Sequence, residues 1–346
     1  MNIPKELPSI SWLVDEPTYR GDLALSYSTL STYEGLGFNG LDHLFDRKET
    51  ASLTLGSCVD SIITGGFEEF NERFSVLNIN ITEGGINTVK QLIAMHLPFN
   101  YFEEIPEQVV SQAAKEVGFW KADKWDKKRY SAVLETGNVA EYYNCLLHTD
   151  KTIIDTDTYS EVIACVQALK ESPATCGYFA DNDELSPIRR YYQLKFKATF
   201  ENVHYRCMAD ELLVDYEKKI VYPIDLKTSS HTEWDFQQSF CQWRYMIQAR
   251  LYWRIIRANM LKDEYFKDFE LMPYRFIVVN KKTLTPLVWE FPLTMEIGTL
   301  VDEEGNEYRD PFEIGKELQA YLNCKPPVPN GINMDGINII QCLKKK

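Results

Sequence analysis

The chain has 346 residues, 45% of them hydrophobic and 13% aromatic, which is enough apolar material for one large domain or two ordinary ones. Acidic residues outnumber basic ones by 51 to 37, and the formal net charge is −14. This balance argues against non-specific nucleic-acid binding over the whole surface, since phosphate contacts need lysine and arginine.

The sequence carries no signal for export, for a membrane span or for a cysteine-bound metal. Its N-terminus lacks a basic start followed by an apolar run, and no apolar stretch reaches about 18 residues. The eight cysteines are scattered singly without a CxxC pair, so neither zinc nor an iron–sulfur cluster is predicted. We expect reduced thiols in a cytoplasm, and no membrane partner.

The first 180 residues are predicted to be mainly helical. A short helix over 25–37 is opened by a cap at Ser26 or Ser28 and stopped by glycines, and a second over 54–66 ends at Gly65-Gly66. Residues 105–120 and 157–172 also have helical patterns.

From residue 190 the pattern changes to β-structure. Three runs, 191–200, 203–215 and 220–230, predict an antiparallel meander. One long helix is expected over 232–260, starting at a capping box of Thr232 and Asp235, followed by a hairpin over 274–291 and a helix over 310–323. The acidic stretch 301–310 is expected to be a solvated loop. We therefore predict a single α/β domain with a helical N-terminal part.

The hairpin formed by the second and third runs opposes two acids. If residues 216–219 are its loop, Asp215 faces Ile220 and Asp210 faces Asp225, with Cβ atoms about 5 Å apart. Such carboxylates repel, and a divalent cation would convert the repulsion into coordination. Lys227 lies on the same face, and an ammonium beside Mg²⁺ suits phosphodiester hydrolysis.

A simpler interpretation stays open at this point. The hairpin could be a solvated one in which Asp225 and Lys227 form a loose ion pair, because the register can slip by one residue. Pro223 adds to this, since proline cannot donate to a central ladder and favours a bulge or an edge strand.

Asp210 in "MADELLVD" and Asp225-Leu226-Lys227 in "IDLKT" resemble the signature of the PD-(D/E)XK nuclease superfamily. "QARLY", with Gln248 and Tyr252, is similar to the QxxxY helix of RecB-like nucleases. "LGSCVD", with Gly56, is similar to their upstream GxxxH helix. "EPTYRGDLALSYSTLSTY" looks like the N-terminal segment of RecE-type phage exonucleases. These matches span residues 15–252.

The resemblance implies one nuclease domain over 1–346 with a restriction-endonuclease-like core: a central mixed sheet, with the catalytic sheet and QxxxY helix in 190–292 and a C-terminal helix and tail in 293–346. It implies Mg²⁺, with Mn²⁺ as the alternative ion. The implied catalytic residues are Asp210, Asp225, Lys227, Gln248 and Tyr252. The implied metal ligands are Asp210, Asp225, the backbone carbonyl of Leu226, Asp60 in place of the usual histidine, and Glu184. Two alternatives remain: Tyr252 as a core tyrosine, and Asp60 as a surface residue.

Basic and aromatic residues cluster in "WKADKWDKKRY", residues 120–130, which carries five bases and two acids. Aromatic rings there could stack on a frayed base. The expected DNA contacts are Ser28, Lys124, Trp125, Lys127, Lys128, Arg129, Thr228 and Arg244. The C-terminal "LKKK" is a further basic patch, and a solvated surface is the alternative for both patches.

The resemblance implies a metal-dependent exonuclease on double-stranded DNA ends, acting in phage recombination or repair. It further implies a single-strand annealing protein as partner, assembly into an oligomer, and a cytoplasmic location in a bacterium or a phage-infected cell. The alternatives are a structure-specific endonuclease of the same fold and a catalytically silent DNA-binding module.

Overall fold

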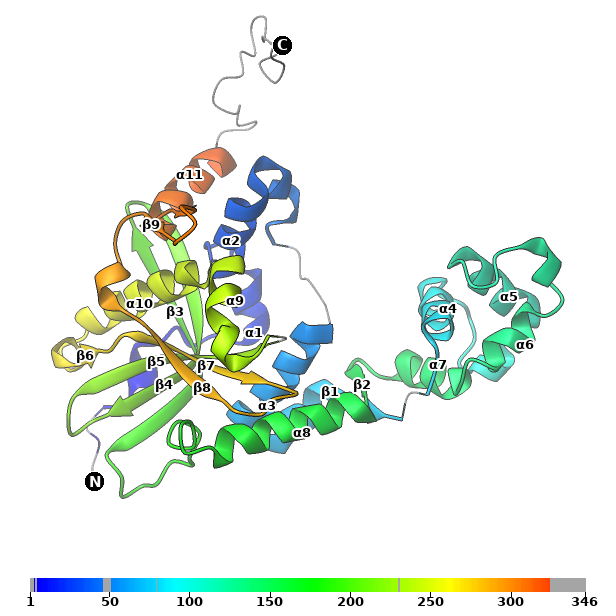
Figure 1. Ribbon diagram of the computed structural model, residues 1–346, viewed down its shortest axis with the longest axis horizontal. Coiled ribbons are helices and arrows are strands. Elements are labelled where there is room, and N and C mark those ends of the chain that lie inside the picture. The colour runs from blue at the N-terminus through cyan, green and yellow to red at the C-terminus, as the bar shows by residue number, and fades with distance from the viewer. Residues whose placement is uncertain (1–2, 4, 46–50, 79, 230, 324–346) are drawn as a thin grey trace, which may run out of the picture. The chain divides into compact units, whose positions relative to one another are not determined.

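The computed structural model describes residues 3, 5–45, 51–78, 80–229 and 231–323 (Figure 1). The chain forms two compact units. The sheet unit comprises Met1–Glu49, Ser172–Val279 and Thr285–Lys346, and the helical unit comprises Thr50–Glu171 and Asn280–Leu284. That both act as a single nuclease domain stays a prediction, and each unit is described by itself.

The sheet unit contains a six-stranded, mostly antiparallel sheet. Its strands are β3 Ile188–Phe200, β4 Val203–Asp215, β5 Ile220–Ser229, β6 Glu270–Leu271, β7 Tyr274–Asn280 and β8 Leu287–Phe291. Their order is β3-β4-β5-β7-β8, and the short β6 pairs with β5 in parallel. The predicted α/β class, with a mixed sheet, an antiparallel meander and flanking helices, is confirmed.

Two turns set the register of the meander. Glu201 and Asn202 both have positive φ, of 48° and 66°, as a tight two-residue hairpin requires. In the next turn, Asp215 Oδ1 accepts hydrogen bonds from the backbone amides of Glu217 and Lys218. The β4–β5 ladder then pairs Asp215 with Ile220 and Glu211 with Ile224, which confirms the predicted register.

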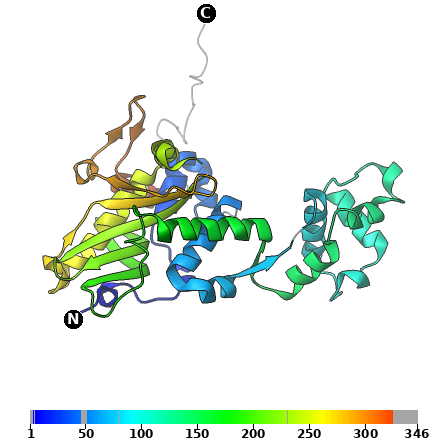
Figure 2. The same cartoon turned by 60° about the horizontal axis from the view of Figure 1, so that its bottom comes forward.

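Helices cover one face of this sheet. The chain starts with η1 Leu7–Ile10, α1 Glu16–Gly21, α2 Tyr27–Leu36 and η2 Gly37–His43, and ends with η7 Leu293–Met295, β9 Leu300–Val301, β10 Glu307–Tyr308 and α11 Pro311–Asn323. The helix α10 Tyr245–Leu261 packs on β3, β4, α2 and α11 (Figures 1 and 2). The predicted solvated loop over 301–310 is wrong in part, because β9 and β10 form a small antiparallel hairpin there.

The predicted single helix over 232–260 is also wrong. The structure has η5 Glu233–Asp235, α9 Phe236–Gln242 and then α10. Arg244 lies between α9 and α10 in the left-handed region, with φ of 55°. The apolar pattern of residues 232–260 runs through both helices, so periodicity alone could not locate the break between them. Thr232 is the N-cap of η5, as predicted, but the predicted capping box is wrong, because the Thr232 hydroxyl donates to the Asp235 carboxylate and makes no bond to the backbone of the first turn.

The helical unit has its own core around Val89, Val110 and Tyr143. It contains α3 Ala51–Arg73, β1 Phe74–Leu77, α4 Glu83–Ala94, η3 Phe102–Glu104, α5 Glu107–Glu116, η4 Asp123–Trp125, α6 Arg129–Leu134, α7 Val139–His148, β2 Thr152–Asp155 and α8 Thr156–Glu171. The remaining short helix, η6 Phe266–Asp268, belongs to the sheet unit. The predicted stop at Gly65-Gly66 is a break inside α3, where Gly66 has φ of 72°. Over the described residues, no helix is both long and apolar enough to cross a membrane.

Candidate active site

Asp210 and Asp225 occupy the next positions in register after the last β4–β5 pair, Glu211 and Ile224. The Asp210 carboxylate reaches across to β5, where Oδ2 accepts a hydrogen bond of 3.0 Å from the backbone amide of Leu226. The structure therefore brings together the two acids that the hairpin register predicts.

The two strands part at this point. Along the part of β4 that β5 no longer pairs with, Leu25 makes the backbone hydrogen bonds instead. Its amide donates to the His204 carbonyl at 2.8 Å, and its carbonyl accepts from the Arg206 amide at 2.9 Å. The chain between α1 and α2 thus enters the fork between β4 and β5, and α2 starts two residues later.

The backbone is irregular on the other side of Asp210 as well. Gln193, opposite Asp210 on β3, has φ of 53°, which is rare for a residue with a side chain. The apolar alternation of β4 changes phase here: Cys207 and Ala209 belong to the same core as Leu212 and Val214. Such irregularities re-aim side chains, and this one falls at Asp210.

Pro223 does not place β5 at an edge, so that expectation is wrong. It pairs with Leu212 inside a continuous strand that has neighbours on both sides. Val221 pairs with Leu271 in parallel, and two more steps in this register reach Pro273, in the gap between β6 and β7. The missing amide of Pro223 therefore falls where the neighbouring strand is interrupted.

Asp225 is buried, with 1% of its surface exposed. Its Oδ1 accepts a hydrogen bond from Gln248 Nε2 on α10, and its Oδ2 lies 2.6 Å from Lys227 Nζ. The alternative of a loose, solvated ion pair is therefore wrong. Burial favours the neutral form of Lys227, but the carboxylates of Asp225 and Asp210 outweigh it and raise the pKa of this ammonium above its usual value.

Lys227 is further fixed by an aromatic ring. Its Nζ lies 4.7 Å from the ring centroid of Tyr245, the first residue of α10. The Tyr245 ring in turn packs against Tyr27, the first residue of α2, with 6.1 Å between centroids. Tyr245 was missed from the sequence, because only the tertiary fold brings it to the lysine.

Gln248 Oε1 is buried and makes no hydrogen bond with any described residue, and Asp225 Oδ2 is buried with the ammonium of Lys227 as its partner. Buried acceptors are normally satisfied, and a hard cation takes oxygen ligands of this kind. Leu226 directs its amide, and with it its carbonyl, toward the fork at Asp210. The residues present thus fit Mg²⁺.

The protein supplies few ligands for such an ion. Among the described residues, no group of three or more histidines, cysteines, aspartates or glutamates could hold a metal. Two carboxylates and a carbonyl are nevertheless a usual protein share for Mg²⁺, which keeps waters and binds substrate phosphates as well.

Tyr252 lies one turn after Gln248 on α10 and is buried. Burial, followed by the charges of its neighbours including Asp225 and Asp210, raises its pKa well above the usual value. Its hydroxyl therefore stays protonated and can donate a hydrogen bond. Tyr274 at the start of β7 packs against it, with 6.3 Å between ring centroids, and its buried hydroxyl has no partner among the described residues. Tyr274 was missed by the sequence analysis.

Arg206 is another residue near the site that the sequence did not predict. Its side chain is buried, and its Nε and Nη1 make no hydrogen bond within the described part of the chain. The guanidinium lies over the ring of Tyr19 on α1, with Cζ 4.8 Å from the centroid. An unsatisfied buried cation on the strand that carries Asp210 adds positive charge on this side of the sheet.

The predicted DNA contacts in the sheet unit, Arg244, Ser28 and Thr228, differ in exposure and in direction. Arg244 does not extend the stripe of Gln248 and Tyr252, because it precedes α10 in the left-handed region, and its Nη1 lies against Gly35 of α2. Ser28 is exposed at the start of α2, with its hydroxyl 2.9 Å from that of Ser26. Thr228 is half-buried and alternates to the face opposite Lys227.

One predicted metal ligand of the sheet unit, Glu184, is not brought to the pair. Glu184 is exposed in the loop before β3, whose first residue pairs with Asp215. Ile188 at the start of β3 therefore lies beside Asp215, which is five residues, or about 16 Å along the strand, from Asp210. Glu184 precedes this end of β3. Asp60 and Gly56 lie on α3, in the helical unit, so the role of Asp60 stays a prediction.

In the helical unit, Lys124, Lys127 and Lys128 are exposed and Trp125 is half-buried. Arg129 is buried and hydrogen-bonded to backbone carbonyls, so its prediction as a DNA contact is wrong. The C-terminal "LKKK" lies outside the described residues.

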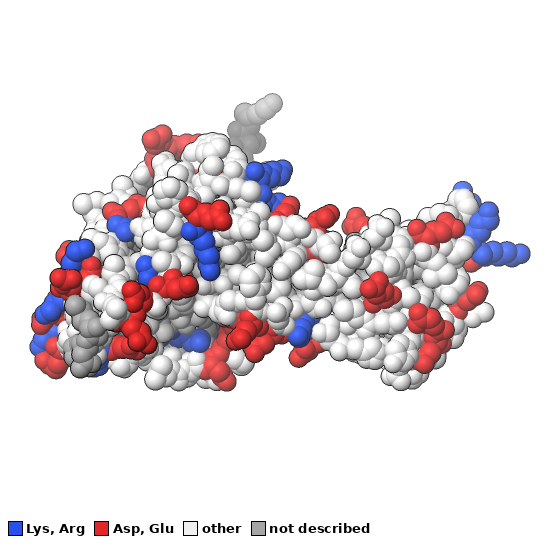
Figure 3. Space-filling model, turned by 90° about the horizontal axis from the view of Figure 1, so that it is seen from below, with Lys and Arg blue, Asp and Glu red and all other residues white. Residues whose placement is uncertain are grey.

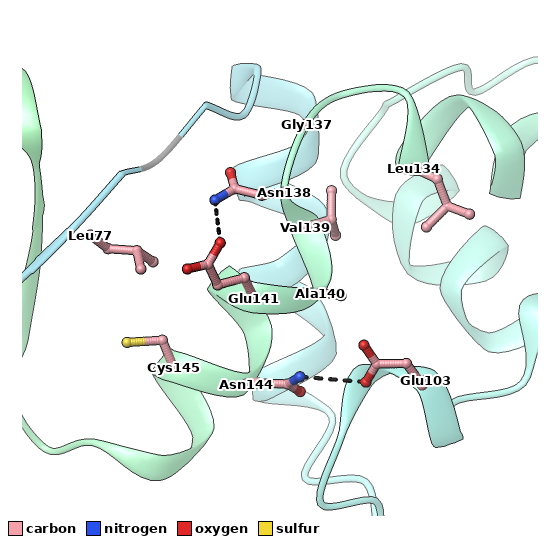
Figure 4. A pocket seen from close by; sticks show the side chains of 10 residues that line it. All are labelled: Leu77, Glu103, Leu134, Gly137, Asn138, Val139, Ala140, Glu141, Asn144 and Cys145. Atoms are coloured by element: carbon pink, nitrogen blue, oxygen red, sulfur yellow. Dashed lines mark hydrogen bonds between the residues drawn. The ribbon is translucent and has the colours of Figure 1, made fainter.

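A pocket of about 740 Å³ opens in the helical unit beside α7 (Figure 4). Its polar side chains include Glu141, which accepts from Asn138, and Glu103, which accepts from Asn144. No lysine or arginine occurs among its lining residues, all of them in the described part of the chain. Its negative charge makes it unsuited to phosphate.

Comparisons with known proteins do not assign a function to this chain. No family model and no curated protein matches the chain. A solved structure from Eubacterium rectale, named "Putative exonuclease", is similar with a TM-score of 0.47 and 13% sequence identity, over 90% of this chain and 86% of that one. A likeness of this degree does not assign an activity to this chain.

Proposed function

We propose that this protein is a Mg²⁺-dependent deoxyribonuclease that hydrolyses phosphodiester bonds at the ends of double-stranded DNA. The observation that carries the proposal is the buried constellation at the β4–β5 fork. Asp210 and Asp225 meet there, Lys227 lies 2.6 Å from Asp225, and the buried Gln248 Oε1 has no donor among the described residues.

Each residue has a role that its contacts support. Asp210, Asp225 and the Leu226 carbonyl would hold Mg²⁺, which polarises a phosphoryl oxygen and lowers the pKa of water. Lys227 stays charged and offsets the negative charge that develops on the phosphate. Gln248 fixes the orientation of Asp225 through its hydrogen bond. The protonated Tyr252 hydroxyl donates to the phosphate or to the attacking water.

The exonuclease type is supported by the resemblance of the motifs to RecB-like and RecE-type enzymes. The same resemblance supports a role in phage recombination or repair, a single-strand annealing protein as partner, an oligomeric assembly and a cytoplasmic location.

The test is digestion of linear duplex labelled at the 5′ or the 3′ end, beside a covalently closed circle, in Mg²⁺ or Mn²⁺. We expect the linear duplex to be degraded and the circle spared. Asp225→Asn, which keeps the side-chain shape, should lower the rate at least about 100-fold. The matched control is Glu184→Gln, an exposed acid remote from the pair, which should keep wild-type activity.

Melting temperatures measured by circular dichroism separate a catalytic defect from unfolding. Wild-type digestion by a folded Asp225→Asn protein would overturn the site assignment. Cleavage of the closed circle as fast as the linear duplex would overturn the exonuclease type and leave an endonuclease.

A further inference from the structure

The loop between α5 and α6, residues 120–128, presents aromatic rings at the surface of an acidic protein. We call it the Trp–Lys loop. The Trp120 side chain is 40% exposed, and its ring packs against Trp125 with 4.9 Å between centroids. Trp120 has φ of 47°, directly after Gly118 with φ of 84° and Phe119. The chain thus turns sharply to hold a large apolar ring toward solvent.

Arg129 holds this loop in shape. The residue is 2% exposed, with Nε donating to the Trp120 carbonyl at 3.0 Å and Nη2 donating to the Ala122 carbonyl at 3.2 Å. Nη2 also lies 2.7 Å from Asp126 Oδ1. Three positions of the loop are therefore fixed by one buried side chain, and the ring pair is organised before any partner binds.

The loop leaves four positive charges uncompensated. Its two acids are neutralised from outside, Asp123 by Lys115 at 2.6 Å and Asp126 by Arg129. Its lysines are all exposed, and none of them pairs with a carboxylate of the described residues: Lys121, Lys124, Lys127 and Lys128. Figure 3 shows basic side chains gathered at the right-hand end of the view, where Figure 1 places α5 and α6.

We infer that the Trp–Lys loop binds single-stranded DNA. Unpaired bases offer ring faces that stack on tryptophan, and the adjoining phosphates match the lysines in charge. A duplex keeps its bases stacked inside, so it could use the lysines but not the rings. Lys124 Nζ already lies 5.0 Å from the Trp125 ring centroid, which puts cation and ring within the span of one nucleotide. The inference rests on the proposed action on DNA, and it names the strand form that this surface recognises.

The test measures fluorescence anisotropy of a labelled 20-nucleotide thymidine strand with the full chain, in the absence of divalent cations. Binding is then read without hydrolysis, so its failure is distinguishable from failure of the proposed nuclease. Converting Lys121, Lys124, Lys127 and Lys128 to glutamate should raise Kd about 10-fold or more and flatten its salt dependence. The matched control converts four exposed lysines elsewhere to glutamate, Lys90, Lys170, Lys262 and Lys282, and should change Kd less than about threefold.

Stacking is tested separately by Trp120→Ala combined with Trp125→Ala. We expect Kd for the single strand to rise about fivefold or more and Kd for a duplex of equal length to stay within about twofold. Trp234→Ala, at an exposed tryptophan of the sheet unit, is the control and should leave both unchanged. Equal loss for single strand and duplex, wild-type affinity of the lysine variant, or competition by poly-glutamate as strong as by DNA would each overturn the inference.

Discussion

Glu211, the neighbour of Asp210 on β4, should make the fold less stable as the pH rises. Its side chain is 1% exposed, and neither carboxylate oxygen has a hydrogen-bond partner among the described residues. Burial raises the pKa of Glu211 from 4.5 to about 8, although the charge of Arg190 acts against it. The residue therefore stays protonated in the folded protein at neutral pH.

The size of the effect follows from linkage between proton binding and folding. Below pH 4.5 the carboxyl is protonated in both states and has no effect. Between 4.5 and 8 only the unfolded state ionises, so the free energy of unfolding falls as the pH rises. A pKa difference of about 3.5 corresponds to about 5 kcal/mol at most, reached at pH 8 and above.

Glu211→Gln removes the titration and keeps the side-chain shape. In urea unfolding followed by circular dichroism, variant and wild type should have similar free energies of unfolding at pH 4.5. At pH 8 the variant should be the more stable, by up to about 5 kcal/mol. Glu303→Gln, at an exposed acid, is the control and should show no such pH dependence. A difference between Glu211→Gln and wild type that stays constant from pH 4.5 to 8 would refute the reasoning.

Three further substitutions probe the fork. If the hydroxyl of the buried Tyr252 acts on the substrate as proposed, Tyr252→Phe should lower kcat about 10-fold or more with little change in melting temperature; a loss of stability without loss of kcat would make Tyr252 a core residue. Gln248→Met removes the donor to Asp225 Oδ1 and should weaken Mg²⁺ binding about 10-fold, measured as the Mg²⁺ concentration for half-maximal activity; unchanged Mg²⁺ dependence would contradict this. Gln193→Gly relieves a positive φ and should raise the free energy of unfolding by about 1 kcal/mol in urea titration; an unchanged or lower value would contradict this.

The hairpin register was predictable because it depends on local information. The four-residue loop from Tyr216 to Lys219 fixes which residues of β4 and β5 face each other, and a shift by one would expose Val214 and Val221. From that register the opposition of Asp210 and Asp225 follows by counting. Lys227 follows from the alternation of side chains along β5.

The break between α9 and α10 was not predictable in the same way. No glycine or proline marks it, and the left-handed conformation falls on Arg244. The apolar residues on both sides pack into one core, which makes two helices look like one. The prediction that Arg129 contacts DNA was wrong for a related reason. Its charge suggested a contact with a ligand, whereas its guanidinium donates to carbonyls of its own loop.

The residues that complete the site come from segments far apart in the chain. Tyr245 reaches Lys227 from α10, Tyr274 reaches Tyr252 from β7, and Arg206 meets Tyr19 from α1. None of these pairs has a sequence spacing that could reveal it. Only packing of the helices on the sheet brings them together.

Several features that are unfavourable for a fold coincide at the β4–β5 fork. Two carboxylates share one end of a ladder, a lysine is largely buried, the buried Gln248 Oε1 lacks a donor among the described residues, and Gln193 has a positive φ opposite Asp210. Each of these costs about 1–3 kcal/mol when nothing compensates it. Apolar residues at these positions would make a more stable sheet. Because a bound cation and a phosphate would satisfy the oxygens and the lysine at the same time, their coincidence in one place favours a ligand-binding site over a structural one.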